Sequence, residues 1–151
     1  MSLEKWQEQG KVVFLFCRGQ GCPVGSRYLS GFQDSVQYIL NKGASVVAIT
    51  PETSENAEKI IAKTGMSFTV IPDQNGEIMK AYDVLFSVTE KYQKKINMAL
   101  KSDIAENNGA KEALLPVPAT YIIDKNGTIE KVFFDHNYKK RASVKEILEV
   151  L

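Results

Sequence analysis

Apolar and polar residues recur with two different periods along the chain, and together they predict a fold of strands and helices. The apolar run at residues 12–17 is unbroken, which is typical of a strand that is buried on both faces. Over residues 23–41 the apolar side chains recur at steps of three and four, so we expect a helix there. Lys42 and Gly43 should end that helix.

The middle of the chain continues the pattern. Residues 44–49 predict a second strand, and Thr53 or Ser54 is suited to cap a helix that ends near Gly65. Residues 68–71 predict a short strand, which is followed by the turn sequence Pro-Asp-Gln-Asn-Gly. The spacing of apolar residues then predicts two further helices, at residues 78–82 and 88–100.

The last third predicts a β-hairpin and a closing helix. Two β-rich runs, 120–124 and 128–134, flank Lys-Asn-Gly, and an Asn-Gly pair between such runs favours a hairpin turn. We expect residues 106–118 to form a loop and residues from 144 onward to form a helix. This order of elements requires parallel pairing first and antiparallel pairing later. The pattern therefore predicts an α/β thioredoxin-like fold, with a central mixed β-sheet flanked by helices.

Composition adds limits on the class of protein. The chain has 151 residues, 44% of them apolar, with no repeat or linker, so we expect one domain over residues 1–151. A net charge of +1 gives no reason to expect nucleic acid or an anionic membrane as a partner. No apolar run approaches the length of a membrane span, and residues 3–9 do not read as a secretory signal. Because two cysteines do not make a disulfide framework, we expect a cytoplasmic protein.

The segment Arg-Gly-Gln-Gly-Cys-Pro-Val-Gly-Ser carries the main candidate chemistry. Pro23 favours the first position of a helix, which places Cys22 at or beside the N-cap, where free N–H groups favour a thiolate. Arg18 adds a positive charge there if the loop curls back. Cysteines in such settings have pKa values of about 3.5–7.5, and their thiolates attack peroxides or disulfides. The alternative is that Cys22 is only a small residue packed at a helix start.

Other candidate residues have simpler interpretations. Cys17 ends an apolar strand, so we expect a core residue, with a resolving role toward a Cys22 sulfenate as the alternative. His136 is the single histidine and is expected on a solvated loop, and no spacing suggests a metal site or a cofactor. The basic residues 139–141 are expected to form a solvated face. Pro118 precedes a strand, and the residues leave open whether its peptide bond is cis or trans.

These residues together resemble a known family. From Lys11 to the C-terminus the chain is similar to the peroxiredoxin-like proteins of the alkyl hydroperoxide reductase/thiol-specific antioxidant (AhpC/TSA) group, within the thioredoxin superfamily. The likeness rests on five segments in the family's order: VVFLFCRGQGCP, GASVVAITPET, FTVIPDQNGEIMKAYDV, LPVPATYIIDKNGTIEKVFF and DHNYKKRAS. It implies that Cys22 is the reactive cysteine. Three residues fall on the family's neighbours of that cysteine, namely Arg18, Gly19 and Pro23. Pro118 falls on the proline that thioredoxin folds place beside the active site, which is commonly cis, and Thr120 falls on a residue that follows this proline.

The chain also departs from the pattern of that family. Gly21 stands where a tryptophan is usual, and Gly25 stands where a second cysteine is usual. Cys17 replaces a common tyrosine. Gly19 lies three residues before Cys22, where well-studied peroxiredoxins carry a threonine. Thiol exchange within a Cys-x-x-Cys motif is therefore not available to this chain.

The leading hypothesis is an antioxidant thiol peroxidase in which Cys22 reduces a hydroperoxide and an external thiol restores it, without a cofactor. The alternatives are a redox sensor or partner-binding protein with a degenerate site, and a weak thiol–disulfide oxidoreductase. By resemblance, a homodimer is expected.

Overall fold

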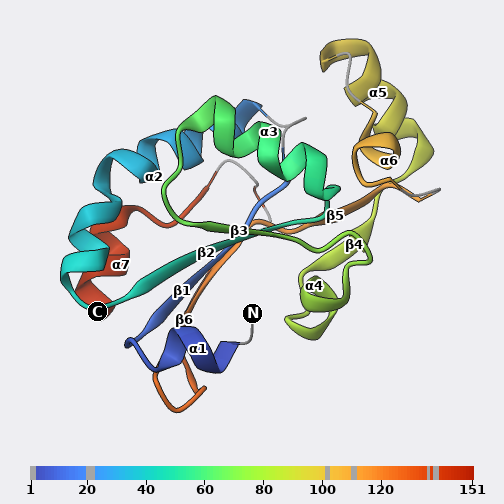
Figure 1. Cartoon of the computed structure of the whole chain (residues 1–151). Coiled ribbons are helices and arrows are strands. Elements are labelled where there is room, and N and C mark those ends of the chain that lie inside the picture. Colours follow the sequence, from blue (N-terminus) through green and yellow to red (C-terminus); the bar gives the residue numbers. More distant parts are fainter. Residues whose placement is uncertain (1–2, 20–22, 101–102, 110–111, 136, 138–139) are drawn as a thin grey trace.

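The computed structural model (Figure 1) describes residues 3–19, 23–100, 103–109, 112–135, 137 and 140–151, with residues 23–26 described by their backbone alone. A five-stranded sheet has the strand order β3-β2-β1-β6-β7, and β4 and β5 form a separate two-stranded sheet. The helices are α1 (Leu3–Gln7), α2 (Pro23–Asn41), α3 (Ser54–Thr64), α4 (Glu77–Ala81), α5 (Glu90–Leu100), α6 (Ile104–Asn107) and α7 (Val144–Val150). The strands are β1 (Val12–Phe16), β2 (Ser45–Thr50), β3 (Thr69–Pro72), β4 (Leu85–Ser87), β5 (Leu114–Pro116), β6 (Ala119–Ile123) and β7 (Ile129–Phe134).

Strand β1 lies at the centre of the main sheet, and all five of its residues are buried. It pairs in parallel with β2, from Val12 opposite Ser45 to Phe16 opposite Ile49. On its other side it pairs antiparallel with β6, which places Phe16 opposite Ala119. The expected parallel crossovers and the antiparallel hairpin of β6 and β7 are therefore confirmed, and so is the mixed sheet. The unbroken apolar run of β1 follows from the two covered faces of the sheet.

Two hydrophobic cores lie on opposite faces of this sheet. Helices α2, α3 and α7 cover one face, and α1 and α4 cover the other (Figure 1). The buried residues of the first core include Val13, Leu15, Cys17, Leu29, Phe32, Ile39, Ile60, Ile122 and Ile147. Those of the second core include Trp6, Phe14, Phe16, Ile49, Met79 and Tyr121. Alternate side chains of β1 thus enter opposite cores, as the period of a strand requires.

The predicted loop at residues 106–118 is wrong in part. This segment contains the end of α6 and all of β5, and β5 pairs antiparallel with β4. Each strand of that pair has three residues, which is too short for a hydrophobic period to show in the sequence. The helix predicted at residues 88–100 is present as α5; none of its residues is buried, and Ile96 packs against a small cluster of Ile104, Ala113 and Leu115. With α6 and β5, α5 lies at one end of the molecule, beyond the main sheet (Figure 1).

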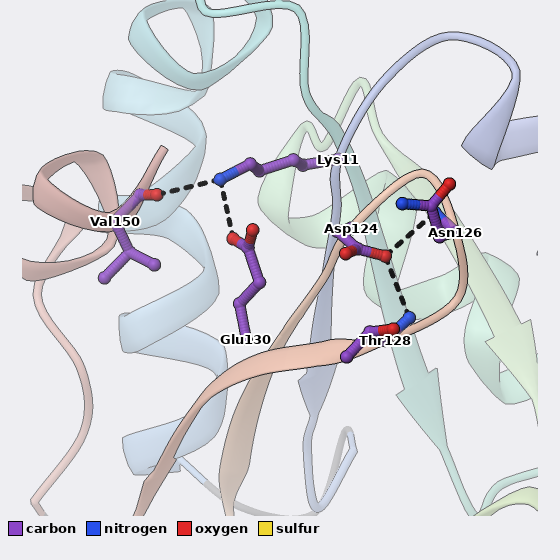
Figure 2. A network of polar contacts seen from close by, with 6 residues as sticks. All are labelled: Lys11, Asp124, Asn126, Thr128, Glu130 and Val150. Carbon is purple, nitrogen blue, oxygen red and sulfur yellow. Dashed lines mark hydrogen bonds and ion pairs between the residues drawn. The ribbon is translucent and has the colours of Figure 1, made fainter.

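The expected caps and turns are present. The Thr53 side chain accepts a hydrogen bond from the backbone of Asn56, and Gly65 ends α3 in the left-handed conformation. In the β6–β7 turn, Asp124 Oδ1 accepts from the backbone N–H groups of Asn126, at 2.8 Å, and Thr128, at 2.9 Å (Figure 2). The hairpin predicted from Asn-Gly is therefore confirmed.

Lys11 joins three elements just before the start of β1. Its Nζ donates to Glu130 Oε2 in β7 at 2.6 Å and to the carbonyl oxygen of Val150 in α7 at 3.2 Å (Figure 2). A cation near the last carbonyls of a helix also interacts favourably with the helix dipole. Lys11 thus fixes the C-terminal helix against the sheet. Within the part of the chain that the structure describes, no helix combines the length and the apolar character that crossing a membrane requires.

Candidate functional site

The segment that carries the candidate nucleophile leaves the sheet at the end of β1. The described chain runs to Gly19 on one side of Cys22 and resumes at Pro23, the first residue of α2, on the other. The predicted start of the helix at Pro23 is therefore confirmed. Cys22 itself and Gly21 lie outside the described residues, so their roles stay predictions.

Cys17 lies in the core, as expected. Its side chain is 2% exposed, and its Sγ is a donor to the carbonyl oxygen of Ile49 at 3.4 Å. The backbone N–H of Cys17 donates to the same oxygen at 3.0 Å, which extends the pairing of β1 with β2 by one residue. Burial of this kind is typical of a structural cysteine, which behaves as a small hydrophobic residue. The resolving role of Cys17 stays a prediction.

Arg18 turns away from the core toward β4 and α5. Its Nη1 donates to the Tyr92 hydroxyl at 3.3 Å, and its Cζ lies 5.8 Å from the centroid of the Phe86 ring. Arg18 lines a surface cavity of about 400 Å³ with Phe86, Ser87, Val88, Thr89 and Tyr92. A ring face attracts a guanidinium electrostatically. The interaction of that charge with Cys22 stays a prediction.

Gly19 packs against a buried carboxyl group that the sequence did not single out. Gly19 has a φ of +91°, and a Cβ added to it would lie 2.4 Å from Cδ of Glu52. Glu52 is 1% exposed and follows β2 by two residues. Because β1 and β2 are parallel, their carboxyl ends meet at one edge of the sheet, and this brings Glu52 to the loop after β1. A charged residue two positions after a buried strand is the signal that identifies it.

Pro118 is buried immediately before β6. The Val117–Pro118 peptide bond is trans, so the cis bond implied by the family resemblance is wrong for this chain. The trans bond continues the chain from β5 into β6, and Val117 N–H donates to the carbonyl oxygen of Val84 at 2.8 Å on the way. A trans bond is also the favoured state of an X–Pro bond by about 0.5–1 kcal/mol.

Thr120 belongs to a buried polar contact between β6 and α2. Its side chain hydrogen-bonds the Tyr28 hydroxyl, which donates to the carbonyl oxygen of Ala142 at 2.8 Å. Burial raises the pKa of Tyr28 to about 12, so the phenol stays protonated. Arg141 lies over the same ring, with its Cζ 5.2 Å from the centroid. The solvated basic face predicted for residues 139–141 is therefore wrong for Arg141, whereas Lys140 is exposed and Lys139 lies outside the described residues.

A cavity of about 340 Å³ brings several of these residues together. Cys17, Pro118 and Thr120, three of the residues expected at the site, line it. It lies where β1 ends, β6 begins and β7 ends, because Phe16 is paired with Ala119 and Ala119 with Phe134. Its other lining residues are Leu15, Phe16, Tyr28, Ala119, Lys131, Val132, Phe133, Phe134, Asp135, Lys140, Arg141, Ala142 and Glu146. The cavity is thus at the same end of the sheet as the loop that leads to Cys22.

Known proteins with similar sequences include a peroxiredoxin, a putative peroxiredoxin and a thiol-disulfide oxidoreductase. The chain is 24% identical to the chloroplastic peroxiredoxin Q of Sedum lineare, over 100% of this chain and 68% of that protein. It is 23% identical to the putative peroxiredoxin bcp of Helicobacter pylori strain J99, over 93% of this chain and 80% of that protein. It is also 23% identical to the thiol-disulfide oxidoreductase ResA of Geobacillus thermodenitrificans, over 82% of this chain, and spans 55% of the length of ResA.

The fold and the family agree with these relatives. The crystal structure of peroxidoxin BcpB from Mycobacterium tuberculosis superposes with a TM-score of 0.73 at 15% identity, covering 98% of this chain and 82% of that one. This likeness shows the thioredoxin-like fold of the peroxiredoxins. The sequence profile of the AhpC/TSA family matches residues 1–132. The chain therefore belongs to the AhpC/TSA family.

Proposed function

We propose that this protein is a thiol-dependent peroxidase with Cys22 as its reactive cysteine. The observation that carries the proposal is the AhpC/TSA match, which runs through the Cys22 segment and on to β7. The peroxiredoxin relatives support the same activity. The position of Cys22 immediately before Pro23 supports its role, because α2, a helix of 19 residues, begins there.

The reaction has two parts, both of them carried by one sulfur atom. The Cys22 thiolate attacks an oxygen of the hydroperoxide, an S–O bond forms, and the O–O bond breaks. The electron pair leaves on the alkoxide, which takes a proton and departs as an alcohol. An external thiol then attacks the sulfenic acid, which releases water and leaves a mixed disulfide. A second thiol completes the reduction and restores the Cys22 thiolate.

The residues around the reactive loop have separate parts in this proposal. Arg18 supplies the positive charge that favours thiolate over thiol, and the free N–H groups at the start of α2 do the same. Gly19 lets the loop pass closely over Glu52, since glycine adopts its φ readily and a Cβ there would overlap the Glu52 side chain. Pro118 and Thr120 form the wall of the neighbouring cavity.

The similarity to ResA favours thiol–disulfide exchange as the second candidate function. Gly25 argues against it, because a Cys-x-x-Cys pair resolves its own mixed disulfide and this chain has no cysteine at that position. We infer the peroxidase rather than the oxidoreductase for this reason. Reduction of insulin disulfides by the isolated protein, at a rate that depends on Cys22, would reverse that choice.

We further infer a single domain over residues 1–151, a cytoplasmic location and a homodimer. The dimer is supported by β7, an edge strand whose Ile129, Val132 and Phe134 are each 40% or more exposed. An exposed apolar edge strand is a template for pairing with another chain. Sedimentation of the wild type as a dimer and of Val132→Lys as a monomer is the expected result. A wild-type monomer would refute this part of the proposal.

Peroxide consumption with dithiothreitol as the reductant tests the central activity. We expect turnover by the wild-type protein, loss of at least about a hundredfold in Cys22→Ser, and retained turnover in Cys17→Ser. Cys17→Ser is the matched control, because it also replaces one sulfur by oxygen. Undiminished turnover in Cys22→Ser would refute the assignment of the nucleophile.

A further inference from the structure

The cavity at the end of β1, β6 and β7 is lined by both apolar and charged residues. The lining includes apolar residues from these three strands, among them Leu15 and Phe133. Its rim carries three cations, Lys131, Lys140 and Arg141, and two carboxylates, Asp135 and Glu146. Convergent charged groups beside apolar residues fix the orientation of a small molecule in such a cavity.

Contacts within the protein engage both carboxylates of the rim. Glu146 accepts from the backbone N–H of Ser143 at 2.7 Å as part of the capping box of α7, and this bond lowers its pKa. Asp135 accepts from the backbone N–H of Asn137 at 2.8 Å and lies 3.9 Å from Lys140 Nζ. Each carboxylate thus has a structural role that does not require a ligand.

Two of the three cations of the rim contact aromatic rings, and the third, Lys140, is the one beside Asp135. Arg141 and Lys131 lie over aromatic rings, those of Tyr28 and Phe133, at 5.2 and 5.6 Å from the ring centroids. A ring face attracts a cation without neutralising it. No carboxylate among the described residues lies within ion-pair distance of Lys131. Three cations against two carboxylates leave the rim with a net positive charge that favours an anionic ligand.

We propose that this cavity binds the reducing thiol, and that the thiol is a small molecule carrying a carboxylate group. This inference rests on the proposed peroxidase function. Gly25 in place of a second cysteine means that the Cys22 sulfenic acid must be reduced by a thiol from outside its own motif. The cavity opens at the end of the sheet where the Cys22 loop begins, and its volume of about 340 Å³ suits a small molecule.

The chemical step balances with the thiol as the only reductant. The sulfur of the bound thiol attacks the sulfenic sulfur of Cys22, an S–S bond forms and the S–O bond breaks. The hydroxyl leaves as water with the proton of the thiol. A second molecule of the same thiol attacks the mixed disulfide, which yields the symmetric disulfide of the reductant and the Cys22 thiol. The carboxylate of the reductant stays on the cationic rim throughout.

Three thiols of similar size and different charge test the proposal. They are 3-mercaptopropionate, 2-mercaptoethanol and cysteamine, which carry a negative, no and a positive charge. The measurement is the second-order rate of sulfenic acid reduction for each thiol at fixed ionic strength. In Lys131→Glu, the rate with 3-mercaptopropionate relative to 2-mercaptoethanol should fall roughly fivefold to thirtyfold, and the relative rate with cysteamine should rise. Dividing the rate of each variant by the rate of the wild type with the same thiol removes the effect of the intrinsic reactivity of that thiol.

Two further variants complete the design. Lys140→Glu should show the same direction of change, and it covers the case in which Lys131→Glu does not fold. Lys125→Glu is the matched control, because Lys125 is exposed in the β6–β7 turn at the other end of β6 and makes the same change in net charge. It should leave all three rates unchanged.

The outcomes separate the two levels of the proposal. If the rim variants turn over and their rates relative to the wild type are the same for all three thiols, the thiol subsite is overturned and the peroxidase function stands. A change in the KM for peroxide, with unaltered thiol rates, would overturn it as well and would assign the cavity to the peroxide. No turnover with any thiol, dithiothreitol included, would overturn both proposals.

Discussion

Gly19→Ala is predicted to destabilise the protein more than its backbone conformation alone explains. The new Cβ would lie 2.4, 2.5 and 2.8 Å from Cδ, Oε1 and Cγ of Glu52. Because Glu52 is 1% exposed, its carboxyl group must shift within the protein interior to relieve this overlap. The left-handed φ of +91° adds its own cost for any residue with a Cβ.

Gly43→Ala is the matched control for this prediction. Gly43 has a φ of +76°, and an added Cβ there would meet nothing within 4 Å, so the substitution carries the conformational cost alone. We expect Gly43→Ala to cost about 1–2 kcal/mol of unfolding free energy. Gly19→Ala should cost a further 1–3 kcal/mol or so, because it also forces overlap in a packed region.

Urea denaturation, monitored by the fluorescence of Trp6, measures the loss of unfolding free energy in both variants, since Trp6 is the single tryptophan and is buried. Combining Gly19→Ala with Glu52→Ala removes the overlapping atoms, so the double variant should lose less stability than the two single losses added together. Equal losses in Gly19→Ala and Gly43→Ala, or additive losses in the double variant, would refute the contact between Gly19 and Glu52.

Two further predictions concern stability. Because burial raises the pKa of Tyr28 from 10.0 to about 12, its stabilising effect is complete below pH 10 and is lost as the pH rises toward 12. The wild type should therefore lose about 2–3 kcal/mol relative to Tyr28→Phe over that range, and parallel pH curves of unfolding free energy would contradict this. Lys11→Met should cost about 0.5–1 kcal/mol in low salt and less in 1 M salt, because the partly exposed pair with Glu130 is screened. An equal cost at both salt concentrations would show that the ion pair contributes nothing.

The order and type of the long elements could be predicted because their patterns are long enough to be read. Helix α2 spans 19 residues with one apolar face, and its start at Pro23 and its end before Gly43 both carry local signals. The β6–β7 hairpin likewise has a local signal, the pair Asn126 and Gly127 in its turn. Strands β4 and β5 have no such signal, because each is three residues long and its partner is distant in the chain.

At the site, too, features with a local signal could be predicted and contacts between distant residues could not. The chemistry expected of Cys22 rests on its neighbour Pro23, so it could be inferred from adjacent residues. Glu52 meets Gly19 only because two parallel strands end together, and Arg141 meets Tyr28 only because α7 returns to α2. Contacts between residues that lie 33 or 113 positions apart in the chain depend on the fold, and a local pattern does not reveal them.

Mass spectrometry of the protein after one equivalent of peroxide, in the presence of dimedone, tests the central claim most directly. Dimedone traps sulfenic acids, so the peptide that contains Cys22 should carry one adduct. The peptide that contains Cys17 should carry none, because that thiol is buried. An adduct on Cys17, or unmodified Cys22 under conditions in which peroxide is consumed, would contradict the assignment of Cys22 as the reactive cysteine.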